Sequence, residues 1–147
     1  MKAINISARE IADLKDLPKG WCCISINEEH YDYYPIGFDQ EGKDERILRV
    51  RFSDVTAPIS KIAHDNMVFN PINDDTAKKI VDFIEENKGK NLLVHCAAGV
   101  SRSAAVCLYA HLTYSHGVKD NFWALSHPNK FVLGALLVSR LYARSLE

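Results

Sequence analysis

Residues 91–103 have the sequence NLLVHCAAGVSRS, and this stretch decides how the chain folds. Its first part, 91–95, is a continuous and mainly apolar run, as expected for a central strand of a parallel sheet. Small residues follow, and Ser103 opens an apolar, Ala-rich stretch that is typical of a helix. The stretch therefore predicts a strand, a seven-residue loop from Cys96 through Arg102, and a helix.

Such a loop is suited to hold an anion. Its backbone N–H groups can converge on one point, and the N-terminus of the following helix adds positive potential. The small residues at 97–99 let the backbone approach the anion closely, and the planar guanidinium of Arg102 can grip two oxygens. The same potential favours the thiolate form of Cys96, which would then face a bound phosphate as a nucleophile.

Outward from this stretch, strands and helices alternate along the chain. We expect strands at 21–26 and 47–52 besides 91–95, a loop at 27–46, and helices at about 7–17, 73–88, 103–116, 120–126 and 131–145, with a further short helix opened by Pro58. The alternation predicts one α/β domain over residues 1–147, with a central, mostly parallel sheet flanked by helices. Ligands of such sheets bind at the carboxyl ends of the strands, here the loops 53–58 and 96–102.

The composition is that of an ordinary globular domain. Of the 147 residues, 47% are apolar and 25% charged, and the formal net charge is −1. We therefore expect neither a nucleic acid nor a membrane partner. No apolar run approaches the roughly 20 residues of a membrane span, and the N-terminal segment is too polar for a signal peptide, so we expect a cytoplasmic protein with reduced thiols.

The loop resembles the signature of the cysteine-dependent protein phosphatases, HC-x5-R-[ST]. His95, Cys96, Arg102 and Ser103 fill its four fixed positions, and the ending AGVSRS is similar to that of the dual-specificity branch. The resemblance implies a protein tyrosine phosphatase-like fold of the dual-specificity type and the hydrolysis of phosphomonoesters on phosphoproteins, with phosphotyrosine as substrate and phosphoserine or phosphothreonine as further candidates. It implies no metal and no organic cofactor.

The resemblance also implies a role for each residue of the loop. Cys96 would be the nucleophile that forms a phosphocysteine intermediate, and Arg102 would bind the phosphoryl oxygens. Ser103 would donate a hydrogen bond to the leaving thiolate, and His95 would orient the loop and help to keep the cysteine ionised. The phosphate cradle would consist of the N–H groups of Ala97, Ala98, Gly99, Val100, Ser101 and Arg102.

A general acid is needed to protonate the leaving group, and the family places an aspartate on the loop after the strand that precedes the signature strand. Asp54 matches that position, directly after the predicted strand 47–52. Asp65 fits a bare spacing count better, but no strand precedes it immediately. We therefore favour Asp54 and keep Asp65 as the alternative.

Other residues are open to two interpretations. Tyr31, Tyr33, Tyr34 and Phe38 either line the rim of the pocket or cover the edge of the core. Cys22 or Cys23 is a candidate for a regulatory disulfide with Cys96, whereas Cys107 is expected in the core. His127, Pro128 and Asn129 are expected to join two helices, with a water-positioning role as the alternative for Asn129. The four cysteines and six histidines show no spacing suited to zinc.

Two other functions remain as alternatives. The first is a phosphatase of small or lipid phosphates. Relatives that act on highly charged inositol phosphates tend to carry lysines in the loop, and Ala97, Ala98 and Val100 supply none. The second is a catalytically weak module that binds a phosphorylated ligand.

Overall fold

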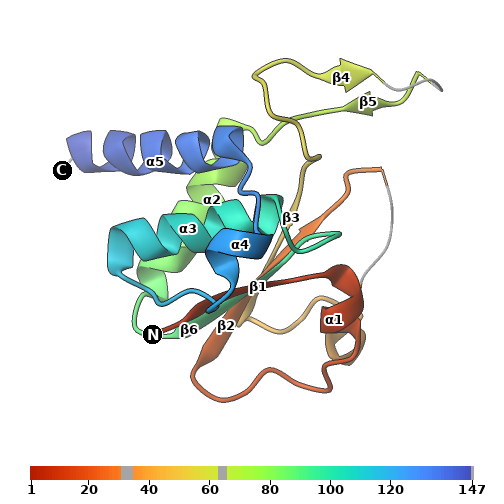
Figure 1. Cartoon of the computed structure of the whole chain (residues 1–147), viewed down its shortest axis with the longest axis vertical. Helices are drawn as coiled ribbons and strands as arrows, with labels where there is room; N and C mark the ends of the chain where they lie inside the picture. The colour runs from red at the N-terminus through yellow and green to blue at the C-terminus, as the bar shows by residue number, and fades with distance from the viewer. Residues whose placement is uncertain (31–34, 63–65, 147) are drawn as a thin grey trace.

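A parallel sheet of four strands, in the order β1-β6-β2-β3, lies at the centre of the fold (Figure 1). The computed structural model describes residues 1–30, 35–62 and 66–146. The strands of this sheet are β1 (Ala3–Ile6), β2 (Trp21–Asn27), β3 (Ile47–Arg51) and β6 (Asn91–His95). The predicted α/β class, with a mostly parallel sheet flanked by helices, is confirmed, and so are the three predicted strands.

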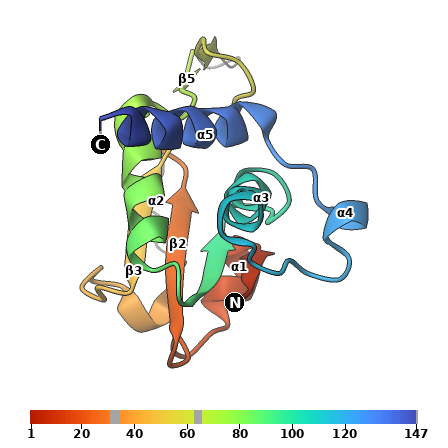
Figure 2. The ribbon, with the colours of Figure 1, turned by 90° about the vertical axis from the view of Figure 1, so that its left-hand side faces the viewer.

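Helices cover both faces of the sheet (Figure 2). One face carries α2 (Asp74–Glu86) and α3 (Arg102–Tyr114), and α5 (Lys130–Ser145) packs across both of them. The other face carries the short α1 (Ala8–Ala12) together with the segment around the 3-10 turn η1 (Gly37–Asp39). A single turn, α4 (Phe122–Leu125), lies between α3 and α5. The helices predicted after residue 73 are therefore confirmed, with ends that differ by a few residues.

The apolar residues divide into two cores because successive side chains of a strand point to opposite faces. In β2, Cys22 belongs to the core beneath α2, α3 and α5, whereas Cys23 belongs to the core beneath α1. In β6, Val94 and Leu93 divide in the same way. The sheet is thus buried on both faces, which explains why its central strands read as continuous apolar runs.

Side-chain caps fix the starts of three helices. Ser7 and Glu10 form the capping box of α1, with Ser7 Oγ accepting from the N–H of Glu10 and the Glu10 carboxylate accepting from the N–H of Ser7. Asn73 caps α2 and Asn129 caps α5 through their side-chain oxygens. Asn73 and Asn129 thus fix the points at which α2 and α5 begin.

Three features differ from the sequence prediction. Strand β1 was not predicted. Helix α1 ends at Ala12 rather than near residue 17, because the N–H groups of Asp13 and Leu14 bond the carbonyls three residues back and close the last turn. Leu17 is still buried in the core, and its N–H bonds the Asp16 side chain. The helix predicted at Pro58 is wrong, since the chain instead forms the hairpin of β4 (Lys61–Ile62) and β5 (Val68–Phe69).

Candidate active site

The loop 96–102 connects the carboxyl end of β6 to the start of α3, as predicted. Cys96 is only 2% exposed, and its Sγ lies 3.1 Å from Ser103 Oγ. The N–H of Gly99 donates to the same sulfur at 3.3 Å. The loop therefore curls around the thiol and brings both a hydroxyl and a backbone N–H within hydrogen-bond distance of the sulfur.

A glycine is required at position 99. Its φ is +77°, and a Cβ there would lie 2.4 Å from the carbonyl carbon of Ile6. The loop is held on this side by two further bonds, from the N–H of Ala8 to the Ala97 carbonyl at 3.0 Å and from Asn5 Nδ2 to the Gly99 carbonyl at 2.7 Å. Strand β1 and the start of α1 thus support the loop, although sequence analysis assigned them no part in the site.

Arg102 is buried, and its guanidinium is divided between two oxygens. Nη1 donates to the carbonyl of Phe52 at 2.8 Å, and Nη2 forms an ion pair with Glu28 Oε1 at 2.7 Å. Nε is buried and has no hydrogen-bond partner among the described residues. Glu28 was not predicted as a site residue, because it was placed in the loop 27–46. It directly follows the carboxyl end of β2, so the rule that ligands bind at strand ends would have found it.

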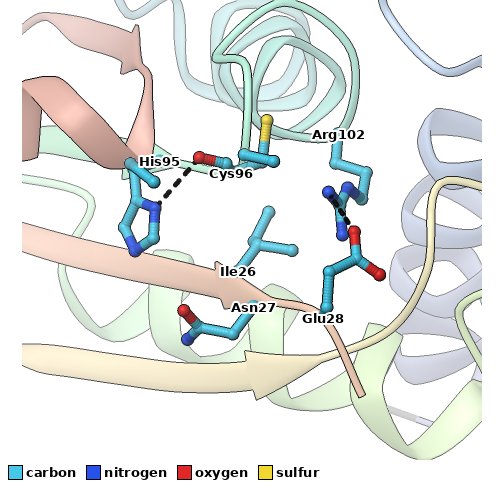
Figure 3. A pocket seen from close by; sticks show the side chains of 8 residues that line it. Ile26, Asn27, Glu28, His95, Cys96 and Arg102 are labelled. Carbon is cyan, nitrogen blue, oxygen red and sulfur yellow. Dashed lines mark hydrogen bonds and ion pairs between the residues drawn. The ribbon is translucent and has the colours of Figure 1, made fainter. Parts of the chain in front are cut away.

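Cys96 lines a pocket of about 450 Å³ (Figure 3). The pocket brings together residues from the start of α1, from the ends of two strands and from the loop, namely Ala8, Ile26, Asn27, Glu28, His95, Cys96, Ala97 and Arg102. Figure 3 shows Cys96 and Arg102 on one side of this space and the end of β2, with Ile26, Asn27 and Glu28, facing them. The predicted nucleophile and the predicted phosphate-binding arginine thus line one pocket.

His95 stands at the end of a chain of buried hydrogen bonds. Asn27 Nδ2 donates to Ser25 Oγ at 3.0 Å, Ser25 Oγ lies 2.6 Å from His95 Nε2, and His95 Nδ1 lies 3.2 Å from the Cys96 carbonyl. A carbonyl only accepts, so Nδ1 carries the proton and Nε2 accepts from Ser25. Burial, with the nearby Arg102 and Arg49 as further causes, lowers the pKa of His95 to about 4. The imidazole is therefore neutral at pH 7, and it contacts the cysteine backbone without adding positive charge to the thiol.

Asp54 lies at the other end of the loop. Its Oδ1 accepts from Ser101 Oγ at 2.9 Å and from Asn129 Nδ2 at 2.7 Å. The same amide of Asn129 donates to the Val55 carbonyl at 3.1 Å. Asp54 is exposed to solvent and is held at the start of α3, as the strand-end argument predicted. The competing candidate, Asp65, lies outside the described residues.

The contacts of Asn129 differ from the water-positioning role that was the alternative for this residue. Its backbone N–H donates to the Ser101 carbonyl at 3.1 Å, and its side chain joins Asp54 to the cap of α5. It is thus a joint between two helices, as expected, and also a support for the Asp54 carboxylate. The position of Asn129 at the start of a helix indicates a capping residue, but the sequence does not indicate that its side chain also bonds Asp54.

The other cysteines are separate from the site. Cys23 pairs with Leu93 in the sheet register, so Cys96 lies three residues, or about 10 Å, farther along the neighbouring strand. This exceeds the roughly 7 Å between Cα atoms that a disulfide can span. Burial raises the pKa of Cys22 to about 11 and that of Cys23 to about 12, and it also raises the pKa of Cys107. A disulfide between Cys96 and Cys22 or Cys23 is therefore excluded by this register, and Cys107 lies in the core as predicted.

Of the aromatic residues that were candidates for the pocket rim or the core edge, the structure describes only Phe38. Phe38 packs against the core beneath α1, in agreement with the core-edge interpretation. Tyr31, Tyr33 and Tyr34 lie outside the described residues. Within residues 1–30, 35–62 and 66–146, no group of three His, Cys, Asp or Glu side chains could hold a metal ion, and no helix is long and apolar enough to cross a membrane.

Comparison with known proteins gives one family. Residues 26–123, more than half of the chain, match the family model for the dual specificity phosphatase, catalytic domain. Dual specificity protein phosphatase 2 of Mus musculus is 48% identical over 44 residues, which are 29% of this chain and 14% of that protein. Dual specificity protein phosphatase 18 of Rattus norvegicus is 41% identical over 70 residues, which are 48% of this chain and 30% of that protein.

The chain thus aligns with less than a third of the length of either curated relative. Among solved structures, the crystal structure of human DUSP28 superposes with a TM-score of 0.55 at 18% sequence identity, over 100% of this chain and 97% of that chain. This likeness shows that the two chains share a fold.

Proposed function

Because the chain belongs to the dual-specificity phosphatase family, we propose that it hydrolyses phosphomonoesters on phosphoproteins through a phosphocysteine intermediate. One observation carries the proposal. Cys96 and Arg102 line the same pocket, and the Cys96 sulfur accepts from the Gly99 N–H and lies within hydrogen-bond distance of the Ser103 hydroxyl. No structural purpose requires a thiol, an arginine and a tight glycine turn to converge on one cavity.

In the first step, the Cys96 thiolate attacks phosphorus, an S–P bond forms, and the P–O bond to the leaving group breaks. The backbone N–H groups of 97–102 and the guanidinium of Arg102 hold the equatorial oxygens, where negative charge concentrates. The neutral His95 orients the loop through the Cys96 carbonyl, 3.2 Å from its Nδ1. In this proposal the loop itself supplies the positive potential, so the reaction uses no metal.

Asp54 is the proposed general acid. It gives a proton to the departing oxygen in the first step and, as a carboxylate, takes one from water in the second. Its contacts with Ser101 and Asn129 support this role, because they hold one carboxylate oxygen at the border of the phosphate loop. The second oxygen of the carboxylate is then the one that would carry the proton.

Ser103 is proposed to act in the second step. When water attacks the phosphocysteine, the S–P bond breaks and the electron pair returns to sulfur. The Ser103 hydroxyl, 3.1 Å from Sγ, can then donate to the developing thiolate.

The substrate we propose is a phosphoprotein carrying phosphotyrosine and, as the family implies, phosphoserine or phosphothreonine. The absence of lysine at positions 97–102 supports this class over highly charged inositol phosphates. All four cysteines are free, which supports a reducing compartment such as the cytoplasm. That the whole span 1–147 forms the phosphatase domain stays a prediction, as the family model covers 26–123.

Turnover of para-nitrophenyl phosphate and of a phosphotyrosyl peptide tests the proposal. The wild-type protein should release phosphate in the presence of EDTA, whereas Cys96→Ser should lose turnover and still bind phosphate, because a serine hydroxyl stays protonated at neutral pH. Cys107→Ala, which removes a buried thiol of α3 away from the pocket, is the matched control and should keep activity. Phosphate binding without turnover by the wild-type protein would instead indicate a binding module.

A further inference from the structure

Glu28 places a carboxylate inside the pocket that the proposed reaction uses. The residue follows the last residue of β2, and its side chain turns toward Arg102 (Figure 3). Oε1 lies 2.7 Å from Arg102 Nη2, and the two side chains are 24% and 4% exposed. A buried guanidinium is therefore paired with an acidic group in the lining of the pocket that Cys96 also lines.

The carboxylate stands where a ligand oxygen would bind. Carboxylate and phosphate present the same kind of charged oxygen to the planar fork of an arginine, which binds both of them through paired N–H groups. Of the Arg102 donors, Nη1 is directed to the Phe52 carbonyl and Nη2 to Glu28, while the buried Nε has no hydrogen-bond partner in the part of the chain that the structure describes. On the edge formed by Nε and Nη2, one donor is thus occupied by Glu28, and the other has no hydrogen-bond partner among the described residues.

We infer that Glu28 is an internal competitor for the phosphate site, and that it sets the affinity of the site for phosphate. This inference rests on the proposed function, in which Arg102 grips the phosphoryl oxygens. A phosphate that takes both Nε and Nη2 must displace the carboxylate, because two anions cannot share one donor and repel each other at this distance.

The contacts of Glu28 allow such a displacement. Apart from the pair with Arg102, its carboxylate has a long contact of 3.3 Å from Ser53 Oγ to Oε2. About a quarter of the side chain is already exposed, so it can leave toward solvent. The backbone carbonyl of Glu28 is held by Arg51 Nη1 at 2.9 Å, which keeps the strand end in place when the side chain moves.

The competition has a consequence for the occupancy of the site by free phosphate. Because each phosphate ligand must break the pair between Glu28 and Arg102, the affinity of the site for every such ligand is lowered by the same factor. Inorganic phosphate has only the cradle to bind and stays weakly bound, whereas a phosphoprotein can offset the loss with contacts outside the pocket. Glu28 would thus keep the site open in the presence of free phosphate, which is also the product of the proposed reaction.

Glu29 provides a matched control. Its carboxylate accepts from the N–H and the side-chain amide of Asn70, at 2.6 and 3.1 Å, and from Ser53 Oγ at 2.9 Å. Burial alone would raise the pKa of Glu29, but these hydrogen bonds outweigh it and lower the pKa. Glu29→Gln therefore removes the same charge one residue away without touching the Arg102 pair.

The experiment compares Cys96→Ser, Cys96→Ser with Glu28→Gln, and Cys96→Ser with Glu29→Gln, each titrated with inorganic phosphate by calorimetry. The serine background removes turnover from the measurement, and urea unfolding verifies that each variant is folded. We expect Glu28→Gln to lower the Kd for phosphate about tenfold, at the low end of the range for a hydrogen bond to a charged group. Glu29→Gln should leave the Kd within about twofold of the background.

A second readout uses the enzyme with its cysteine intact. Glu28→Gln should lower both KM for para-nitrophenyl phosphate and Ki for inorganic phosphate. A higher Kd and a lower kcat in Glu28→Gln would show that Glu28 positions Arg102 and does not compete, which would overturn the inference. Equal Kd values in all three proteins would overturn it as well and leave the proposed function intact. If none of the three binds phosphate, the proposed function itself fails.

Discussion

Acidification should destabilise the domain through His95. This imidazole is buried, accepts from Ser25 at 2.6 Å and donates to the Cys96 carbonyl at 3.2 Å. Protonation of Nε2 would place a positive charge in the interior and would require the Ser25 hydroxyl, which already accepts from Asn27, to turn and accept a second hydrogen bond. Burial is also the main cause that lowers its pKa from 6.5 to about 4. The unfolded chain therefore binds a proton at pH values where the folded chain does not.

The size of the effect follows from the two pKa values. Between pH 6.5 and 4 the unfolded state binds more protons, so stability is fully present above pH 6.5 and falls as the pH decreases. The contribution of this one group to the free energy of unfolding should fall by about 2 kcal/mol between pH 7 and pH 5, and by about 3 kcal/mol once the pH is below 4.

Urea unfolding at pH 7 and pH 5 of the wild type and of His95→Asn measures this contribution. Asparagine keeps an N–H that can reach the Cys96 carbonyl but cannot take up a proton, so the drop in stability between the two pH values should be about 2 kcal/mol smaller in the variant. His127→Asn, which removes an exposed imidazole, is the control for replacing a histidine as such. An equal pH dependence in the wild type and His95→Asn would refute the argument that the buried imidazole resists protonation.

Four further predictions concern the loop and its surroundings. Gly99→Ala should lower the free energy of unfolding by at least about 2 kcal/mol in a urea titration, because its Cβ would overlap the Ile6 backbone at a φ of +77°. Arg102→Lys should lower kcat/KM almost as much as Arg102→Ala, since a point charge cannot grip two oxygens, and kinetics like those of the wild type would contradict this. Asp54→Asn should lower kcat about 10²–10⁴-fold on alkyl phosphates and less on activated aryl phosphates, whose leaving groups need little protonation. Ser103→Ala should slow the second step more than the first, so that rapid mixing shows a burst of released phenol; a slower first step without a burst would assign the hydroxyl to another role.

The part of the site that is local in sequence could be predicted. The strand, loop and helix of residues 91–103 are contiguous, so hydrophobic pattern and small residues sufficed to place Cys96 and Arg102 on one loop. Asp54 could be placed because it follows a strand whose carboxyl end lies at the same edge of the sheet. Glu28 follows the carboxyl end of β2, so the strand-end rule could have marked it as a candidate, but its pairing with Arg102 depends on a rotamer that no sequence pattern records.

The elements that were missed have weak local signals. Strand β1 has only four residues, and one of them, Asn5, is polar and buried, where it bonds the Gly99 carbonyl. A buried polar residue in a short segment is typical of a loop unless its distant partner is known. Leu14 and Leu17 keep helical spacing after α1, yet both pack against the core from an irregular segment, in which the Asp16 side chain accepts the N–H of Leu17.

The contacts that hold the phosphate loop have a consequence for how the site is assembled during folding. Asn5 and Ala8 bind the loop from one end of the chain, and His127 and Asn129 bind it from the other, through the carbonyls of residues 97, 99, 100 and 101. Each contact closes a span of tens of residues or more, and such closures come late because their entropy must be lost before the contact forms. The signature residues are adjacent in sequence, but the conformation of their loop depends on contacts with segments near both ends of the chain. A chain that is still being synthesised would therefore contain the motif before the phosphate-binding loop has its final conformation.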